Sequence, residues 1–248
     1  MIILKSRREI ERMRTSCRIA AEILSRITQA VKPGVTTIEL EDIANQEVSR
    51  RNVKAAFKGY NNFPYALCCS PNDIVVHGMP NSSPLNEGDI LSLDFGVLHD
   101  DFYGDLAVTV PVGRIEHNAS LLLTTTEKSL YLGMEKAVPG GRLHDISYAI
   151  QSYVESSGFS VVRDFVGHGI GRKLHEDPQV PNYGTNGKGC RLNIGMVLAI
   201  EPMINEKSFD VNVLNDGWTV TTRDAGLSAH FEHTVAITEN GPDILTLL

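Results

Sequence analysis

The chain contains little cysteine and no long apolar run, and both absences exclude classes of protein. Only four of its 248 residues are cysteine, and none of them form a C-x-x-C pair. Because the chain also lacks an export signal, we predict reduced thiols and no disulfides. No apolar stretch approaches the roughly 20 residues that a membrane-spanning helix requires, so we do not expect a membrane protein.

Export signals and excess positive charge are also missing. The short apolar start, residues 1–4, is followed at once by Lys5, Arg7 and Arg8, which does not resemble a secretion signal. We therefore expect the protein to stay in the cytoplasm. The formal net charge of −7 opposes non-specific attraction to nucleic acid or to acidic membranes, so small or peptide substrates are the better hypothesis.

The apolar residues that are present, 42% of the chain, are ample for a core and show clear periodicity. Over residues 8–31 they recur at spacings of three and four, which predicts a helix that ends before Pro33-Gly34. Thr36 and Glu39 then have the spacing of a capping box. This pattern predicts a second helix that continues to about Arg51.

The pattern of helices and strands occurs twice. Strand-like segments at 74–77, 89–97 and 102–110 follow the first two helices. The second round consists of helices near 121–137 and 144–156 and strands at 165–168, 197–204 and 231–237. Residues 88–94 (GDILSLD) resemble 195–201 (GMVLAIE), and 105–109 resemble 232–236. We predict one domain over residues 1–248, with similar halves at about 8–115 and 118–240 that share one central site.

Four acids, Asp94, Asp105, Glu201 and Glu232, lie within otherwise apolar predicted strands. Any one of them alone is more simply explained as a strand-end acid that faces water or an arginine. Four of them in a duplicated arrangement would be costly to bury together unless they bind cations. The acids therefore indicate a metal site.

One imidazole completes this set of candidate ligands. His168 lies in the segment 167–171 (GHGIG), where glycines let the backbone approach a ligand closely. One nitrogen and many carboxylate oxygens favour Mn, Fe or Co over zinc. Bridging carboxylates can hold two ions about 3.5–4 Å apart and so supply a hydroxide at neutral pH.

At this point the sequence resembles type I methionine aminopeptidase, the family that removes initiator methionine from nascent chains. The segments that carry the resemblance are 76–80 (VHGMP), 94–96 (DFG), 104–105 (GD), 167–171 (GHGIG), 175–178 (HEDP), 201–203 (EPM) and 232–234 (EHT). The resemblance implies the α+β pita-bread fold, with two pseudo-symmetric halves around a central antiparallel sheet. The first helix begins close to Met1, and the short stretch from Glu201 to Glu232 lacks the insertion of type II enzymes, so the bacterial short form fits best.

The resemblance also implies roles for the ligands. Asp94 would chelate one divalent ion, His168 and Glu201 the other, and Asp105 and Glu232 would bridge both. The identity of the two ions (Co, Mn, Fe or Zn) stays open. Glu201 would also act as the catalytic acid and base.

The family places substrate-contacting imidazoles at His77 and His175, and His175 could stabilise the oxyanion. For the remaining histidines, a structural role is the simpler reading. They are His99, His117, His144, His230 and His233, although His230 shares a strand face with Glu232.

The family builds an apolar slot for the methionine side chain, and its walls align with six residues here. They are Phe57, Tyr60, Phe63, Cys68, Leu174 and Trp218. Each could equally be an ordinary core residue. Phe63 stands where the family usually has tyrosine, Phe57 where cysteine is often found, and Leu174 where an aromatic residue is common.

The implied substrates are nascent polypeptides that begin with methionine and carry a small second residue. Transient contact with the ribosome and a monomeric state follow from the same resemblance. Two alternatives remain: an Xaa-Pro aminopeptidase of the same fold, and a binding module of this fold that has lost catalysis. The first usually carries an additional N-terminal domain, and the second would lack some of the ligands.

Overall fold

Four helices and fifteen short or medium strands are present in the computed structural model, which describes residues 1–248. The helices are α1 (Arg7–Ala30), α2 (Thr37–Arg51), α3 (His117–Met134) and α4 (Leu143–Ser156), with a single 3-10 turn, η1 (Tyr60–Asn62). The strands before α3 are β1 (Lys54–Ala55), β2 (Leu67–Pro71), β3 (Ile74–Val76), β4 (Ile90–His99) and β5 (Phe102–Pro111). Those after α4 are β6 (Ser160–Val161), β7 (Gly167–Gly169), β8 (Glu176–Val180), β9 (Val197–Ile200), β10 (Met203–Asn205), β11 (Val211–Val213), β12 (Val220–Thr222), β13 (Ser228–His230), β14 (His233–Thr238) and β15 (Gly241–Ile244).

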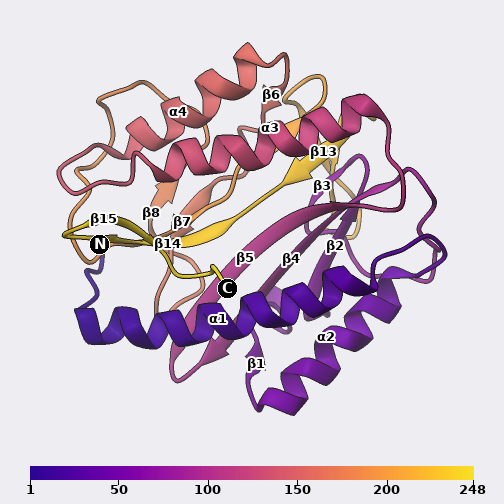
Figure 1. Cartoon of the computed structure of the whole chain (residues 1–248), viewed down its shortest axis with the longest axis horizontal. Helices are drawn as coiled ribbons and strands as arrows, with labels where there is room; N and C mark the ends of the chain where they lie inside the picture. Colours follow the sequence, from indigo (N-terminus) through magenta and orange to yellow (C-terminus); the bar gives the residue numbers. More distant parts are fainter.

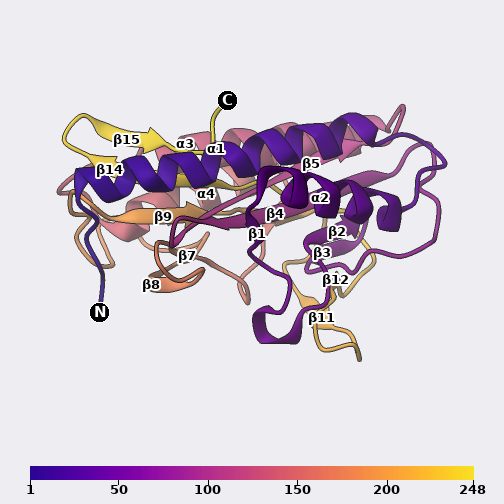
Figure 2. The same ribbon diagram turned by 90° about the horizontal axis from the view of Figure 1, so that it is seen from below.

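The strands form antiparallel sheets, and both pairs of helices cover the same side of them (Figure 1 and Figure 2). In the first sheet β4 pairs with β1, β2 and β5, and in the largest sheet the order is β15-β14-β9-β7-β8. Figure 1 shows α1 and α3 on opposite sides of the central strands β5 and β14. Figure 2 shows α1 and α3 toward one side of the sheets and β8 and β11 toward the other, so the helices leave one side of the sheets to strands and loops.

Capping boxes fix the start of the first two helices. Ser6 and Glu9 form one at α1, and the predicted box of Thr36 and Glu39 is confirmed at α2. There the Glu39 N–H donates to Thr36 Oγ1 at 3.3 Å, and the Thr36 N–H donates to Glu39 Oε2 at 2.8 Å. These bonds satisfy backbone donors that the helix itself leaves unpaired.

The amphipathic helices cover two separate apolar cores. One core contains Leu24, Ile27 and Leu40 from α1 and α2, packed against β4 and β2. The other contains Leu122 and Ile146 from α3 and α4, packed against β9 and β14. None of the helices combines the length and apolar character needed to cross a bilayer.

Several predicted boundaries are wrong by a few residues. Helix α3 begins at His117 and ends at Met134, earlier than the predicted 121–137, and β7 covers 167–169 rather than 165–168. The larger correction concerns 197–204 and 231–237, which we predicted as single strands. The first is interrupted between β9 and β10, and in the second the strand begins only at His233, after the gap that separates β14 from β13. Pro202 explains the first interruption, because proline cannot donate to a strand ladder.

The strand register continues across these interruptions. His233 lies opposite Ile200, and His230 lies opposite Met203, so the pairing resumes without a slip. Between them the Phe231 N–H donates to the Pro202 carbonyl at 3.4 Å. Side chains on both sides of the gap therefore keep the directions that a continuous strand pair would give them.

A seam of side-chain hydrogen bonds joins β5 to the segment 230–234. Thr234 Oγ1 donates to the Asp105 carbonyl at 2.7 Å, and Thr109 Oγ1 donates to the His230 carbonyl at 2.8 Å. Between them the Glu232 N–H donates to the Ala107 carbonyl at 2.9 Å. We call these contacts the central seam, and they bring Asp105 and Glu232 onto adjacent backbone segments.

Candidate metal centre and active site

The five residues predicted as metal ligands line one cavity of about 320 Å³. Asp94 and Asp105 lie within the long strands β4 and β5, and His168 is the middle residue of β7. Glu201 follows β9, and Glu232 precedes β14, so both lie at the interruptions described above. Asp105 and Glu232 are buried, whereas Asp94 and Glu201 are half-buried.

Ligand atoms of three residues come close enough to share an ion. One potential ligand atom from each of Asp105, His168 and Glu232 lies within 4.8 Å of the others. Glu201 extends this cluster, because its Oε1 lies 3.5 Å from His168 Nε2. Asp94 completes the set as a lining residue of the same cavity.

The imidazole of His168 is oriented by its own strand. Its Nδ1 lies 2.9 Å from the carbonyl oxygen of Gly169, a contact in which Nδ1–H donates. This arrangement leaves Nε2 unprotonated and free to bind a metal. Burial lowers the pKa of His168 to about 3, which keeps the ring neutral. The preceding glycine is required, since a Cβ at Gly167 would lie 2.4 Å from the Ala199 carbonyl oxygen.

The acids of the cavity destabilise one another when no cation is present. Burial raises the pKa of Asp105 to about 7. Burial, and then the neighbouring charge of Asp105, raises the pKa of both Asp94 and Glu232 well above the usual range. Burial together with the charges of Asp94 and Asp105 does the same to the pKa of Glu201. Buried acids that repel one another in this way favour cations.

The acids also suit a metal because several of their buried oxygens lack a hydrogen-bond partner. Asp94 Oδ1, Asp105 Oδ1 and Glu232 Oε1 are buried without any hydrogen-bond partner. Buried polar atoms are seldom left unpaired in folded proteins. No arginine or lysine lines the cavity to neutralise them. The residues present therefore suit hard or borderline divalent cations.

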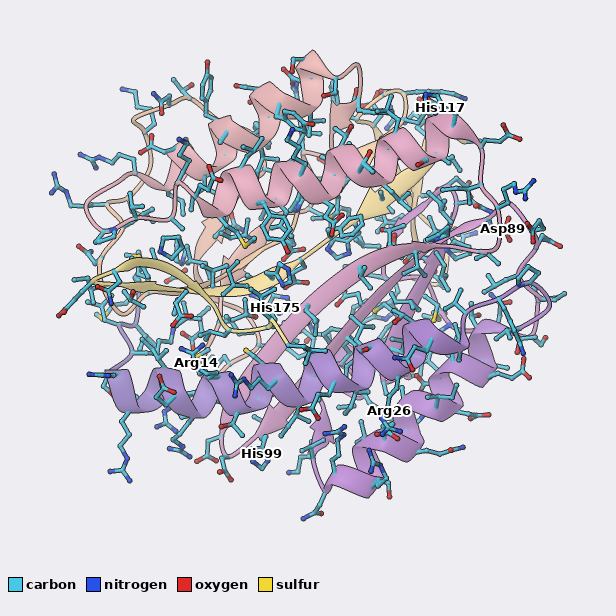
Figure 3. The ribbon with its side chains drawn as sticks, viewed as in Figure 1. Arg14, Arg26, Asp89, His99, His117 and His175 are labelled. Atoms are coloured by element: carbon cyan, nitrogen blue, oxygen red, sulfur yellow. The ribbon has the colours of Figure 1, made fainter.

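Two further imidazoles face the same cavity. His175 Nδ1 lies 2.7 Å from the Tyr60 hydroxyl, and its ring centroid lies 4.3 Å from that of His168. Figure 3 places His175 near the middle of the view, where it lies between the pair α1 and α2 and the pair α3 and α4 in projection. His77 packs edge-on against Trp218 at 5.9 Å and has a φ of +58°, a strained conformation for a residue with a side chain.

All six predicted pocket residues line this cavity beside the acids and imidazoles. They are Phe57, Tyr60, Phe63, Cys68, Leu174 and Trp218. Phe63 and Trp218 meet edge to face with ring centroids 5.1 Å apart. One further lining residue, Asn61, could not be found from the apolar pattern, because it is a polar residue with a φ of +45° within η1.

A smaller cavity of about 110 Å³ adjoins the first and shares His77, His175 and Glu201 with it. Its other walls include Phe165, Met203 and His230. Phe165 and Met203 were not predicted as site residues, although Met203 lies within the segment 201–203. Both ring nitrogens of His230 are buried without a partner, and Nε2 lies 3.8 Å from Glu201 Oε2. The sequence feature that could have indicated this position is that His230 shares a strand face with Glu232.

The chain belongs to metallopeptidase family M24, because residues 11–239 match the sequence model of that family. It is therefore a hydrolase of the metallopeptidase class. Within this class it is similar to methionine aminopeptidases over its whole length. It is 53% identical over 248 residues to the methionine aminopeptidase of Clostridium perfringens, with 100% of both chains covered. It is 51% identical to methionine aminopeptidase 1 of Bacillus subtilis, with 99% of both chains covered.

Solved structures confirm the predicted pita-bread fold. The crystal structure of methionine aminopeptidase from Rickettsia prowazekii has a TM-score of 0.98 at 44% identity and covers 100% of both chains. The prolidase of Pyrococcus furiosus has a TM-score of 0.80 at 21% identity, which shows a shared fold. That alignment covers 99% of this chain but 66% of the prolidase. The prolidase chain therefore extends beyond the aligned region, as we expected of proline-specific peptidases with this fold.

Proposed function

We propose that the protein is a metal-dependent aminopeptidase that removes N-terminal methionine from nascent proteins with a small second residue. The observation that carries this proposal is the single cavity, in which the acid cluster, two imidazoles and an apolar wall lie together. Its full-length relatives are methionine aminopeptidases. An inactive binding module would not need an intact and mutually destabilising set of acids.

Two divalent ions are the proposed cofactors, with Mn, Fe, Co and Zn as candidates. Asp94 would hold one ion, His168 and Glu201 the other, and Asp105 and Glu232 would bridge them. The unpartnered oxygens of Asp94, Asp105 and Glu232 support this assignment. Bound there, such ions would polarise the substrate carbonyl and supply a hydroxide at neutral pH.

The chain's own groups would move protons around the substrate. Glu201 would accept the proton of the attacking water and pass it toward the departing amine. Tyr60 can donate to His175 Nδ1, which leaves the ring proton on Nε2, where it can donate to the substrate carbonyl oxygen. Burial lowers the pKa of His77 to about 4, so that ring is neutral and can accept a bond from the substrate nitrogen.

The apolar wall of the larger cavity would receive the methionine side chain. The Phe63 and Trp218 rings supply flat apolar surfaces, and a flexible thioether packs well against aromatic edges. The smaller cavity offers about 110 Å³ and shares His77 and His175 with the larger one. Phe165 and Met203 close it, so it would admit a small second side chain and exclude a long one.

The test is a peptide assay with metal-depleted enzyme to which Mn, Fe, Co or Zn is added singly. We expect methionine release from Met-Ala-Ser but not from Met-Lys-Ser, and we expect release to require metal. An Ala-Pro-Ser peptide should remain intact. Cleavage of that peptide instead would identify a proline-specific peptidase, and inactivity with every metal would favour the binding module.

The remaining proposals concern the cellular setting. A cytoplasmic monomer that touches the ribosome transiently suits an enzyme whose substrates are emerging chains. We also propose that residues 1–248 form one catalytic domain with two internal halves. The two helix-covered cores around one site support this organisation.

A further inference from the structure

A buried ion pair joins the N-terminal segment to the loop that carries His175. Lys5 Nζ lies 2.6 Å from Glu176 Oε2, and each side chain is only 4% exposed. The other carboxylate oxygen of Glu176 accepts a 3.2 Å hydrogen bond from the Lys173 N–H. Exposed ion pairs contribute little to stability, whereas separating the members of a buried pair is costly, because it leaves buried charges without a partner.

The backbone around Lys5 is shaped to admit it. A Cβ at Gly171 would lie 2.5 Å from Lys5 Cε and 2.7 Å from Glu176 Oε1, so any side chain there would displace the ends of both members of this pair. On the other side, the Lys5 N–H donates to the Gly195 carbonyl at 2.7 Å. Lys5 is thus bound by its backbone to the segment that enters β9 and by its side chain to the residue after His175.

Two side chains of this loop line the cavity, Leu174 and His175, and His175 is bonded to Tyr60. The remaining contacts of the loop are exposed or involve a single backbone bond. Arg172 pairs with Glu9 at 3.3 Å, but its side chain is 54% exposed. The Tyr103 N–H donates to the Gly171 carbonyl at 2.9 Å. Lys5 is therefore the buried, charged side chain through which the N-terminal segment holds residues 171–176.

We propose that Lys5 is a positioning residue of the peptidase. Through Glu176 it holds the 171–176 loop so that the His175 imidazole meets the substrate carbonyl. Neither Lys5 nor Glu176 lines the catalytic cavity, so neither would touch the substrate. The inference rests on the proposed function, which gives His175 its role. Displacing a catalytic group by about 1 Å can lower a rate by about 10²-fold, and a loosened loop should therefore be visible in kcat.

The test neutralises both members of the pair, because removing one alone leaves an unpaired buried charge. Lys5→Met/Glu176→Gln is compared with the unchanged protein on Met-Ala-Ser, with Mn²⁺ at saturation. We expect kcat to fall about tenfold, while KM stays within about twofold. The same double substitution is then made in a His175→Ala background, where we expect no further decrease beyond about twofold.

A matched control separates positioning from general stability. Arg14 joins α1 to β15 through two hydrogen bonds to Asp243, and its side chain is 23% exposed. Arg14→Met should lower the melting temperature while leaving kcat within about twofold, since α1 and β15 carry no residue of the cavity. If the double variant does not fold, Lys5→Arg keeps the charge but forces a larger group against Gly171, and it is assayed in the same two backgrounds.

The outcomes distinguish the inference from the function on which it rests. Equal losses of kcat in both backgrounds, or no loss in either, would refute the positioning role while leaving the aminopeptidase function intact. A fully active His175→Ala enzyme would refute the role of His175 and with it the inference. An unchanged protein that releases no methionine would refute the proposed function itself.

Discussion

Two strand pairs carry the four acids, but they do so in different ways. In the first pair, β4 and β5 run unbroken, with Asp94 opposite Ala107 and Asp105 opposite Gly96. In the second pair, β9 and β14 stop next to Glu201 and Glu232, and β10 and β13 resume the same register. Both pairs deliver acids to the same cavity. Side-chain direction depends on register, so it survives a local break in the ladder.

The interruptions are compensated by bonds from outside the second strand pair. The Glu201 carbonyl accepts a 2.9 Å bond from the buried Asn182 amide, and the Glu232 N–H donates to the Ala107 carbonyl at 2.9 Å. Pro202 removes one donor from the ladder. The ladder of the first strand pair is therefore unbroken, whereas the second depends at its gap on neighbours, including β5 of the first.

The largest expected effect comes from the acid at the first interruption. Glu201→Gln keeps the shape of the side chain but removes its proton-accepting charge, so kcat on Met-Ala-Ser should fall about 10³-fold. Glu239→Gln, which changes an exposed acid in the turn between β14 and β15, should leave kcat unchanged. Comparable activity in the two variants would remove Glu201 from the mechanism.

Metal should stabilise the protein through the acids of both strand pairs. At a free Mn²⁺ concentration of about 100 times Kd, the free energy of unfolding should rise by about 2.7 kcal/mol. Asp105→Asn should abolish most of this gain, because it neutralises a proposed bridging ligand. Asp100→Asn in the turn between β4 and β5 is the control and should keep the full gain. Calorimetry with and without Mn²⁺ measures it, and an identical gain in both variants would contradict the assignment of Asp105.

Breaking the central seam tests whether the two strand pairs depend on each other. Thr109→Val and Thr234→Val each leave a buried backbone donor and acceptor unpaired, so each should lower the free energy of unfolding by about 1–3 kcal/mol. Thr124→Val on the exposed face of α3 should change it by less than about 0.5 kcal/mol. Urea denaturation of the metal-free proteins is the measurement. A lower free energy of unfolding in only one of the two seam variants would show that only that threonine stabilises the contact between the strand pairs.

The smallest expected effect concerns the helices that flank the two strand pairs. Thr36→Ala removes a capping box from α2 and should destabilise the protein by about 1 kcal/mol. Helix α3 begins after Glu116, whose side chain makes no capping bond, so Glu116→Ser should gain a few tenths of a kcal/mol. Thermal denaturation of both variants compares the two helices, and a loss of stability in both would contradict the expected difference between their starts.

Much of the fold could be predicted because it depends on local patterns. The apolar spacing in residues 8–31 and the Thr36–Glu39 box follow from the geometry of a single helix turn, and both are confirmed. The repeated acid positions were visible because strand side chains alternate with a period of two. Phe165 and Met203 were missed because their segments join the site only after distant strands have paired.

By itself, the sequence determined which residues carry chemistry, where the first helices begin and that acid-bearing strands occur twice. Only the tertiary structure decided that Glu201 and Glu232 lie at interruptions, that β5 bonds across the seam, and that Lys5 reaches Glu176. Periodicity and capping act between residues a few positions apart, so the chain displays them openly. Contacts between residues far apart in the sequence depend on how separate segments pack, and no local pattern specifies them.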